Sequence, residues 1–207
     1  MTDQARVPWV VGVSGASGTP YARSVLRGLL DAGHPVDLVV SRAARLTILD
    51  ETGLSFRDSH WAEDLATWLD REPAGVRHWP AGDFAAGPAS GSYRTRGMVV
   101  VPASSAAVAG IALGLSKDLL QRAAGVTLKE RRRLIVTPRE TPLTGATLRH
   151  LVTLDDAGAV VAPPNPGFYA KPKGLQQLVD FVAGKILDVM GIDHDLYTRW
   201  DGRLGGG

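Results

Sequence analysis

The sequence predicts an α/β protein: a three-layer, Rossmann-like (flavodoxin-like) domain built on a doubly wound parallel sheet. Short apolar segments such as WVVGV at 9–13 and MVVV at 98–101 alternate with longer stretches of helical periodicity. Uninterrupted apolar strands separated by helices are typical of parallel sheets that are covered on both faces. No internal repeat or interdomain linker breaks this pattern. We therefore expect one domain over residues 1–207.

The first half of the chain predicts three main strands. They are expected at 9–13, 36–41 and 98–101, with helices at about 21–32, from the second strand to near 51, and at 61–71. Leu65, Trp68 and Leu69 give the last helix its spacing. Residues 75–97 are rich in Gly and Pro, so we expect a loop there with one short strand at 76–79.

The second half continues the alternation. Helices are expected at 104–115, 118–132, 143–156 and 175–190, and strands at 134–137 and 159–162. A Pro-rich loop spans 163–174. The tail from about residue 193 has no periodicity, and we expect it to be mobile or to dock on a neighbouring subunit.

Composition excludes several classes of function. The chain contains no cysteine, which rules out disulfides, a thiolate nucleophile and Cys-ligated metals. A formal net charge of +2 is too small an excess for a nucleic-acid-binding composition. No apolar run approaches the roughly 20 residues that span a bilayer, so the expected location is the cytoplasm. The five histidines are scattered without metal-ligand spacing, and no metal is expected.

Parallel sheets bind ligands beyond the carboxyl ends of their strands, so the segments after the strands are the places to search. The first strand runs into a turn with glycines at 12, 15 and 18. This is not the G-x-G-x-x-G dinucleotide pattern. A tight strand-to-helix turn and a phosphate-binding turn that uses free helix amides explain it equally well.

Polar side chains follow the other strands. Ser41, Ser104 and Ser105 are hydroxyl donors or simply helix caps. Arg139 and Glu140 follow the strand at 134–137. A guanidinium holds a phosphate or carbonyl in bidentate fashion and a carboxyl group moves protons, whereas the plain alternative is an exposed ion pair that contributes little.

Three further features point to an anionic ligand with an aromatic part. Tyr169 supplies a phenol within the Pro-rich loop. Arg122 and Lys129 are seven residues apart, so they share one face of a helix. Lys185 lies in the apolar stretch FVAGKILDVM, where it either extends to solvent or reaches an anion. Together with the segments above, these residues suggest a site for a phosphorylated aromatic ligand.

Over nearly its whole length the chain resembles the flavin prenyltransferase (UbiX) family. The matching stretches are VGVSGASGTPYA, VVSRAARLTILDET, ASGSYRTRGMVVVPAS, GLSKDLLQRAAGVTLKERRRLIVTPRETPL, GAVVAPPNPGFYAKP and LVDFVAGKILDVMGID. LKERR, RET and GFY, in this order and spacing, are the specific part of the match. The GASG motif alone carries little weight.

The resemblance implies an activity. Members of the family join a dimethylallyl group from dimethylallyl monophosphate to N5 and C6 of reduced FMN, without a metal, and release phosphate. The prenylated FMN then serves a decarboxylase of the UbiD type. The resemblance also implies a homo-oligomer, usually a dodecamer built from trimers, with sites at subunit interfaces.

The resemblance also assigns roles by position. Flavin binding falls to Gly15, Ala16, Ser17, Ser41, Ser104, Ser105, Ala106, Ala107 and Arg139. Tyr169 and Lys185 match residues that hold the prenyl phosphate, and Trp200 matches an aromatic residue of the tail. Arg122, Lys129 and Glu140 resemble the remaining phosphate-side and acid–base residues. Ser17 and Glu51 match a pair implicated in proton removal near N5.

The chain departs from the family pattern in one segment. Residues 103–107 read Ala-Ser-Ser-Ala-Ala where the family usually has Cys then Ser, with Thr further on. A thiol and a hydroxyl are lost, although backbone N–H groups could still contact the flavin there. Residues 60–88 carry little family signature and are assigned no role.

Two alternatives stay open. One is a flavin-dependent decarboxylase of the cysteine-decarboxylating group, faintly suggested by Pro-Ala-Ser at 102–104 but lacking a PxMNxxMW substrate clamp. The other is a non-catalytic flavin carrier, which would not need Arg122, Lys129, Glu140 and Lys185.

Overall fold

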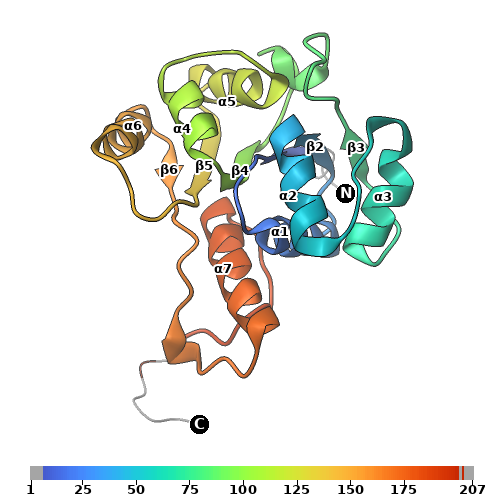
Figure 1. Cartoon of the computed structure of the whole chain (residues 1–207), viewed down its shortest axis with the longest axis vertical. Coiled ribbons are helices and arrows are strands. Elements are labelled where there is room, and N and C mark those ends of the chain that lie inside the picture. Colours follow the sequence, from blue (N-terminus) through green and yellow to red (C-terminus); the bar gives the residue numbers. More distant parts are fainter. Residues whose placement is uncertain (1–6, 201, 203–207) are drawn as a thin grey trace.

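The computed structural model describes residues 7–200 and 202, and in that range six parallel strands form one sheet (Figure 1). The strands are β1 (Trp9–Val13), β2 (Val36–Val40), β3 (Val76–His78), β4 (Gly97–Ala103), β5 (Arg133–Pro138) and β6 (Val160–Val161). Their order is β3-β2-β1-β4-β5-β6. This strand order is that of the Rossmann type, and the six-stranded parallel sheet with its helices confirms the predicted Rossmann-like (flavodoxin-like) doubly wound α/β fold.

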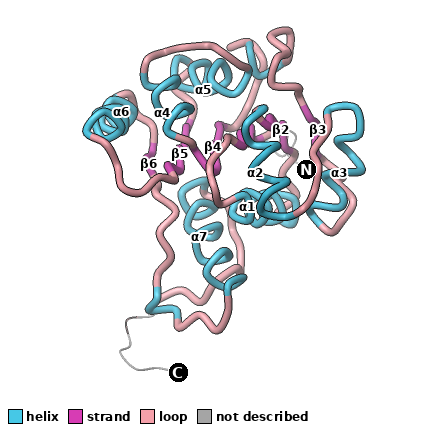
Figure 2. Tube along the Cα trace, in the orientation of Figure 1, coloured by secondary structure: helices cyan, strands magenta, loops and turns pink. Residues whose placement is uncertain are grey.

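Helices cover both faces of the sheet (Figure 2). One face carries α1 (Thr19–Asp31), α2 (Arg42–Thr52), α3 (Trp61–Leu69) and α7 (Leu175–Met190). The other carries α4 (Ser105–Ala112), α5 (Leu119–Lys129) and α6 (Gly145–Asp156). Short 3-10 turns lie at Asp58–His60, Gly87–Ala89 and Phe168–Ala170.

Alternating residues of a strand pack into two separate hydrophobic cores, one on each face of the sheet. Trp9, Val11 and Val13 of β1 pack with α1 and α7, whereas Val10 of the same strand packs with α5. Successive side chains of a strand point to opposite faces, so a strand buried on both sides is mainly apolar. This requirement explains the uninterrupted apolar runs in the sequence. The buried exceptions, Asp37 and Thr137, are hydrogen bonded.

The helix ends follow local chemistry. Thr144 caps α6 by accepting a hydrogen bond from the Thr147 amide at 3.1 Å, so this helix starts at residue 145 rather than 143. Beyond the carboxyl end of α5, Arg131 has a left-handed φ of 56°, so the helix ends before the expected residue 132. The predicted bounds of α7 are confirmed at both ends.

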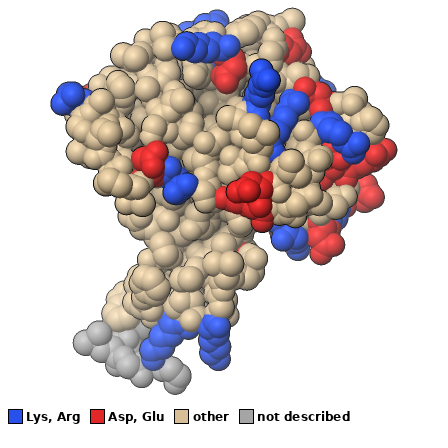
Figure 3. All heavy atoms as spheres, in the orientation of Figure 1, with Lys and Arg blue, Asp and Glu red and all other residues tan. Residues whose placement is uncertain are grey.

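The loop before α7, the amino-terminal end of α7 and the tail form a projection at the lower end of the molecule in Figure 1. Residues 191–200 of the tail fold back on α7 of their own chain. Lys and Arg side chains lie at the tip of this projection in Figure 3. None of the helices within residues 7–200 combines the length and apolar character needed to cross a membrane.

His78 provides a pH-dependent contribution to stability. Its side chain is 1 % exposed at the end of β3, beside Phe56 and Trp61, and its Nε2 lies 2.9 Å from Asp58 Oδ1. Burial lowers the pKa of His78 from 6.5 to about 4, although Asp58 opposes the shift. The unfolded chain therefore binds more protons between about pH 6.5 and pH 4, and stability falls as the pH drops through this window.

We expect His78→Phe to flatten part of that dependence, because Phe keeps the ring packing but does not titrate. Urea unfolding at pH 7 and pH 4.5 measures it. The wild type should lose between about 1 and 3 kcal/mol more than the variant over this interval. Parallel pH profiles for the two proteins would show that His78 does not titrate in this way.

Candidate functional site

Four loops meet at the carboxyl edge of the sheet, where β1 and β4 lie side by side. The helix after β1 covers one face and the helix after β4 covers the other, so the chain diverges here, at the switch point where doubly wound sheets bind ligands, and we call the loops around it the crevice loops. Ser14 joins the two strand ends. Its buried Oγ donates to Pro102 O at 2.8 Å and accepts from the Ser104 amide at 2.7 Å.

The turn after β1 is stabilised by a carboxylate from α2. Glu51 accepts hydrogen bonds from the amides of Gly18 and Thr19, both at 2.8 Å, and from Thr19 Oγ1 at 2.6 Å. The next residue, Pro20, has no amide hydrogen. The start of α1 is therefore filled by the protein's own anion, and the phosphate-binding interpretation of this helix start is wrong.

Ser17 and Glu51, predicted as a pair, are close together. Burial alone would raise the pKa of Glu51, but hydrogen bonds from Ser17, Thr19 and the turn amides outweigh it and hold the pKa below 4.5. Glu51 is therefore ionised at neutral pH. Its carboxylate can orient the Ser17 hydroxyl and fix the turn.

Ser41 and Ser104 act as helix caps. Ser41 Oγ accepts from the Ala44 amide at 3.1 Å, and Ser104 Oγ accepts from the Ala107 amide at 3.2 Å. Ser105 and Ala106 begin α4, where the first amides have no acceptor within the helix. These backbone groups offer the donors that the side chains of residues 103–107 lack.

Arg139 and Glu140 connect the loop after β5 to the other loops. Arg139 Nε donates to Ser17 O at 3.1 Å, and the Arg139 amide donates to Ala103 O at 3.0 Å. Glu140 Oε2 accepts from Ser105 Oγ at 3.2 Å. The alternative, a simple exposed ion pair between Arg139 and Glu140, is therefore not what the structure shows. Arg139 contacts the loop after β1, and Glu140 contacts the segment after β4.

A second group of predicted residues lies on the projection. The ring of Tyr169 meets that of Trp200 edge-on, with centroids 6.1 Å apart, and both side chains are more than half exposed. Lys185 is exposed on α7, with Nζ 3.6 Å from Asp188 Oδ2. The lysine therefore extends to solvent, where it is available to an anion.

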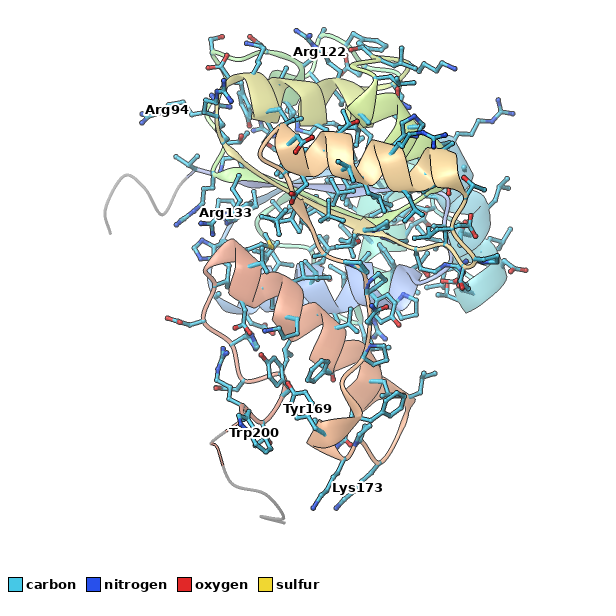
Figure 4. All side chains as sticks on the ribbon, turned by 90° about the vertical axis from the view of Figure 1, so that its left-hand side faces the viewer. Arg94, Arg122, Arg133, Tyr169, Lys173 and Trp200 are labelled. Carbon is cyan, nitrogen blue, oxygen red and sulfur yellow. The ribbon has the colours of Figure 1, made fainter. Side chains whose placement is uncertain are left out.

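The third group is on α5. Arg122 Nε donates to Ala89 O at 3.0 Å, and Lys129 pairs with Glu130 at the end of the helix. Figure 4 shows Arg122 at one end of the long axis of the molecule, and Tyr169 and Trp200 at the other. A single chain therefore does not bring all the predicted phosphate-binding residues together, because α5 and the projection lie on opposite sides of the sheet.

The carboxyl-edge loops fit FMN. A Cβ on Gly15 would lie 2.4 Å from Ala43 Cβ, so the turn after β1 packs directly on the start of α2. The surrounding groups are mainly donors: amides at the start of α4, the Ser17 hydroxyl and the Arg139 guanidinium. Donors of this kind suit the acceptor atoms of a flavin and its phosphate. Within the described range, no cluster of three or more His, Cys, Asp or Glu residues could hold a metal ion.

Comparison with known proteins gives the class and then the family. Residues 1–187 match the family described as Flavoprotein. A flavin prenyltransferase UbiX from Streptomyces coelicolor is 68 % identical over 211 residues, which cover 97 % of this chain and 98 % of that protein. The chain is thus a flavoprotein by class. It belongs to the flavin prenyltransferase (UbiX) family.

Two solved structures share the fold closely. AnUbiX (PadA1), in complex with FMN and dimethylallyl pyrophosphate, is 37 % identical with a TM-score of 0.84, covering 96 % of this chain and 100 % of that one. A dodecameric FMN-dependent UbiX-like decarboxylase from Escherichia coli O157:H7 is 36 % identical with the same TM-score, covering 95 % and 100 %. The FMN-dependent cysteine decarboxylase TvaF, at 17 % identity, shares only the fold.

Sequence reasoning missed three residues that organise the site. Ser14 immediately follows a strand, which was a usable signal for a strand-end contact. Thr19 and Asp188 gave no local signal. The hydrogen-bond partner of Thr19, Glu51, is 32 positions away in the sequence, and the partners of Asp188 lie on the folded-back tail.

Glu51→Ala should destabilise the protein by roughly 1 to 2 kcal/mol at pH 7, because it leaves the start of α1 without its cap. Since the folded-state pKa of Glu51 is lowered, this contribution is present above about pH 4.5 and is lost as the pH falls below it. Urea unfolding at pH 7 and pH 3.5 measures both effects. Asp50→Ala, which removes the neighbouring exposed carboxylate, is the control and should change little.

Proposed function

We propose that this protein is a metal-independent flavin prenyltransferase. It joins a dimethylallyl group from dimethylallyl monophosphate to N5 and C6 of reduced FMN and releases phosphate. The observation that carries the proposal is a set of contacts at the switch point of a UbiX-family chain: Arg139 donates to Ser17 O, Glu140 accepts from Ser105, and Glu51 accepts from Ser17.

The proposed flavin site is made by the crevice loops. Gly15, Ala16 and Ser17 form one wall, with Ser41 behind it. Ser104, Ser105, Ala106 and Ala107 form a second wall with the open amides of α4. Arg139 lies between the walls, where its guanidinium can bind a flavin carbonyl or phosphate while its Nε remains on Ser17 O.

Reduced FMN supplies the nucleophilic N5 and C6. The protein's part is to move protons and hold groups in place. Glu140, hydrogen bonded to Ser105, is the carboxyl group that we assign to proton transfer. Ser17 is placed to relay a proton, because its hydroxyl can take up one proton while it donates its own to the ionised Glu51 carboxylate, which also fixes the orientation of the hydroxyl.

The phosphate that leaves the prenyl donor needs cations to stabilise its negative charge. As the carbon–oxygen bond breaks, the phosphate takes the electron pair, and Arg122, Lys129 and Lys185 can stabilise that charge in place of a metal. Tyr169 donates a hydrogen bond to the phosphate, and Trp200 provides an apolar wall for the allyl group. Because one chain separates α5 from the projection, we propose that Arg122 and Lys129 reach the donor from another subunit.

This arrangement requires an oligomer, and a trimer-based dodecamer agrees with the dodecameric relative. The prenylated FMN would pass to a decarboxylase of the UbiD type, and we place the reaction in the cytoplasm.

Anaerobic incubation with reduced FMN and dimethylallyl phosphate, followed by mass measurement of the flavin, tests the activity. A mass gain of one prenyl group is expected. Retention of unmodified FMN would instead identify a flavin carrier.

Glu140→Gln should keep FMN bound but lower turnover by about 10²-fold or more, the usual contribution of acid–base catalysis. Flavin binding is retained because Gln can still accept the Ser105 hydroxyl. Fluorescence titration of FMN and the mass assay measure the two properties separately. Undiminished turnover would remove Glu140 from the mechanism.

Mixing two weakly active variants tests the assembly of the site. Lys129→Ala and Tyr169→Phe should each be weak alone, yet oligomers reassembled from both should regain part of the wild-type rate. The physical reason is that some interfaces then receive an intact Lys129 from one chain and an intact Tyr169 from another. Reassembled oligomers of each variant alone are the controls, and equal rates in all three samples would place both residues in one chain's site.

A further inference from the structure

Asp188 is the centre of the contacts that hold the tail. It lies in the last turn of α7, where a carboxylate is unfavourable to the helix dipole. Three tail side chains donate to it: Tyr197 Oη at 2.5 Å, Arg199 Nη2 at 2.7 Å and His194 Nε2 at 3.1 Å. Desolvation would raise the pKa of Asp188, but these hydrogen bonds hold it far below its usual range.

The helix surface is shaped to receive the tail. A Cβ on Gly184 would lie 2.5 Å from Tyr197 Cδ1 and 2.7 Å from His194 Cε1. Only glycine lets both rings rest on the helix backbone at this position. Below the tail, a cavity of about 380 Å³ is lined by Phe181, Tyr197 and the loop before α7.

The docked tail is continuous with the residues assigned to the prenyl phosphate. The ring centroid of Tyr197 is 4.9 Å from that of Phe181, which is 5.5 Å from that of Tyr169. Tyr169 in turn contacts Trp200. Lys185, one turn before Asp188, has Nζ 3.6 Å from the same carboxylate. Lys185, Tyr169 and Trp200 are thus all connected to Asp188 directly or through packed rings.

We infer that Asp188 is a positioning residue that clamps the tail onto α7 and thereby sets the prenyl-phosphate side of the active site. The inference rests on the proposed function. Asp188 does not contact the donor itself. It fixes the tail that carries Trp200 and supports Tyr169 through Tyr197 and Phe181. It keeps Lys185 near the site with a loose contact that an incoming phosphate can replace.

Charge and positioning predict opposite results when Asp188 is neutralised. Removing a negative charge near a phosphate site favours phosphate binding by Coulomb attraction alone, so KM for the donor would fall. Losing the clamp releases Trp200 and Tyr169, so KM for the donor rises. The sign of the change therefore separates a positioning residue from a bystander charge.

The test compares Asp188→Asn with wild type as assembled oligomers. We expect faster hydrogen–deuterium exchange across residues 192–200 and a rise of about tenfold in KM for dimethylallyl phosphate, from weakened charge-assisted hydrogen bonds. The Kd for FMN should be unchanged, because the flavin loops lie on other elements. Tyr197→Phe, which removes one donor but keeps the ring, should shift both readouts in the same direction by less.

Asp193→Asn is the matched control, since it removes the charge of an exposed tail carboxylate outside the clamp. It should leave exchange and KM near wild type. An unchanged or lower KM for dimethylallyl phosphate in Asp188→Asn overturns the inference, and so does unchanged hydrogen–deuterium exchange of the tail. If wild type transfers the prenyl group, the proposed function stands in either case. If wild type fails to transfer the prenyl group, the proposed function is wrong. Two measurements then still decide whether Asp188 acts as a clamp: hydrogen–deuterium exchange of the tail, and the Kd of dimethylallyl phosphate measured by calorimetry.

Discussion

The contact between Ser14 and the end of β4 is the constraint on which the candidate site depends. One buried hydroxyl satisfies Pro102 O and the Ser104 amide, so the two diverging loops start from a fixed separation. A buried polar group without a partner costs about 1 to 3 kcal/mol, which favours this single arrangement of the junction. Every residue placed in the flavin crevice is attached to this junction or to a neighbouring strand end.

Glu51 shows how an internal charge can decide where a ligand binds. A helix start attracts anions, but the start of α1 already holds a carboxylate of its own chain. An external phosphate would have to displace a group that is covalently tethered to α2. The first residue of α4 also meets a carboxylate, since Ser105 Oγ donates to Glu140 Oε2 at 3.2 Å, but this bond leaves the Ser105 and Ala106 amides without an acceptor in the helix.

The side chains that we propose for the prenyl phosphate lie on two separate surfaces, α5 and the projection. Positive side chains that gathered around one point in a single chain would repel one another before any phosphate arrived. Placing Arg122 and Lys129 on one surface, and Lys185 on another, avoids that repulsion within the monomer. In the proposed oligomer, assembly would bring the cations together where the donor's negative charge offsets them, and the inferred clamp at Asp188 would hold the projection in place for it.

Local sequence determined much of this protein. The apolar runs predicted the strands, because a strand buried on both faces is mainly apolar and the polar residues in it, such as Asp37 and Thr137, need hydrogen-bond partners. Helical periodicity predicted both ends of α7. The residues that follow the strands were also predictable, since carboxyl ends of parallel strands share one edge. Ser17, Arg139 and Glu140 do meet there.

Only the tertiary structure decided the rest. It placed Glu51 on the start of α1, where its partners lie 32 and 33 positions away in the sequence, and it folded the tail onto Asp188. It also separated Arg122 from Tyr169 and Trp200, which the chain's family motifs had grouped together. Periodicity reports the face on which a residue lies, but contacts between distant segments depend on how whole elements pack, and no local pattern encodes that packing.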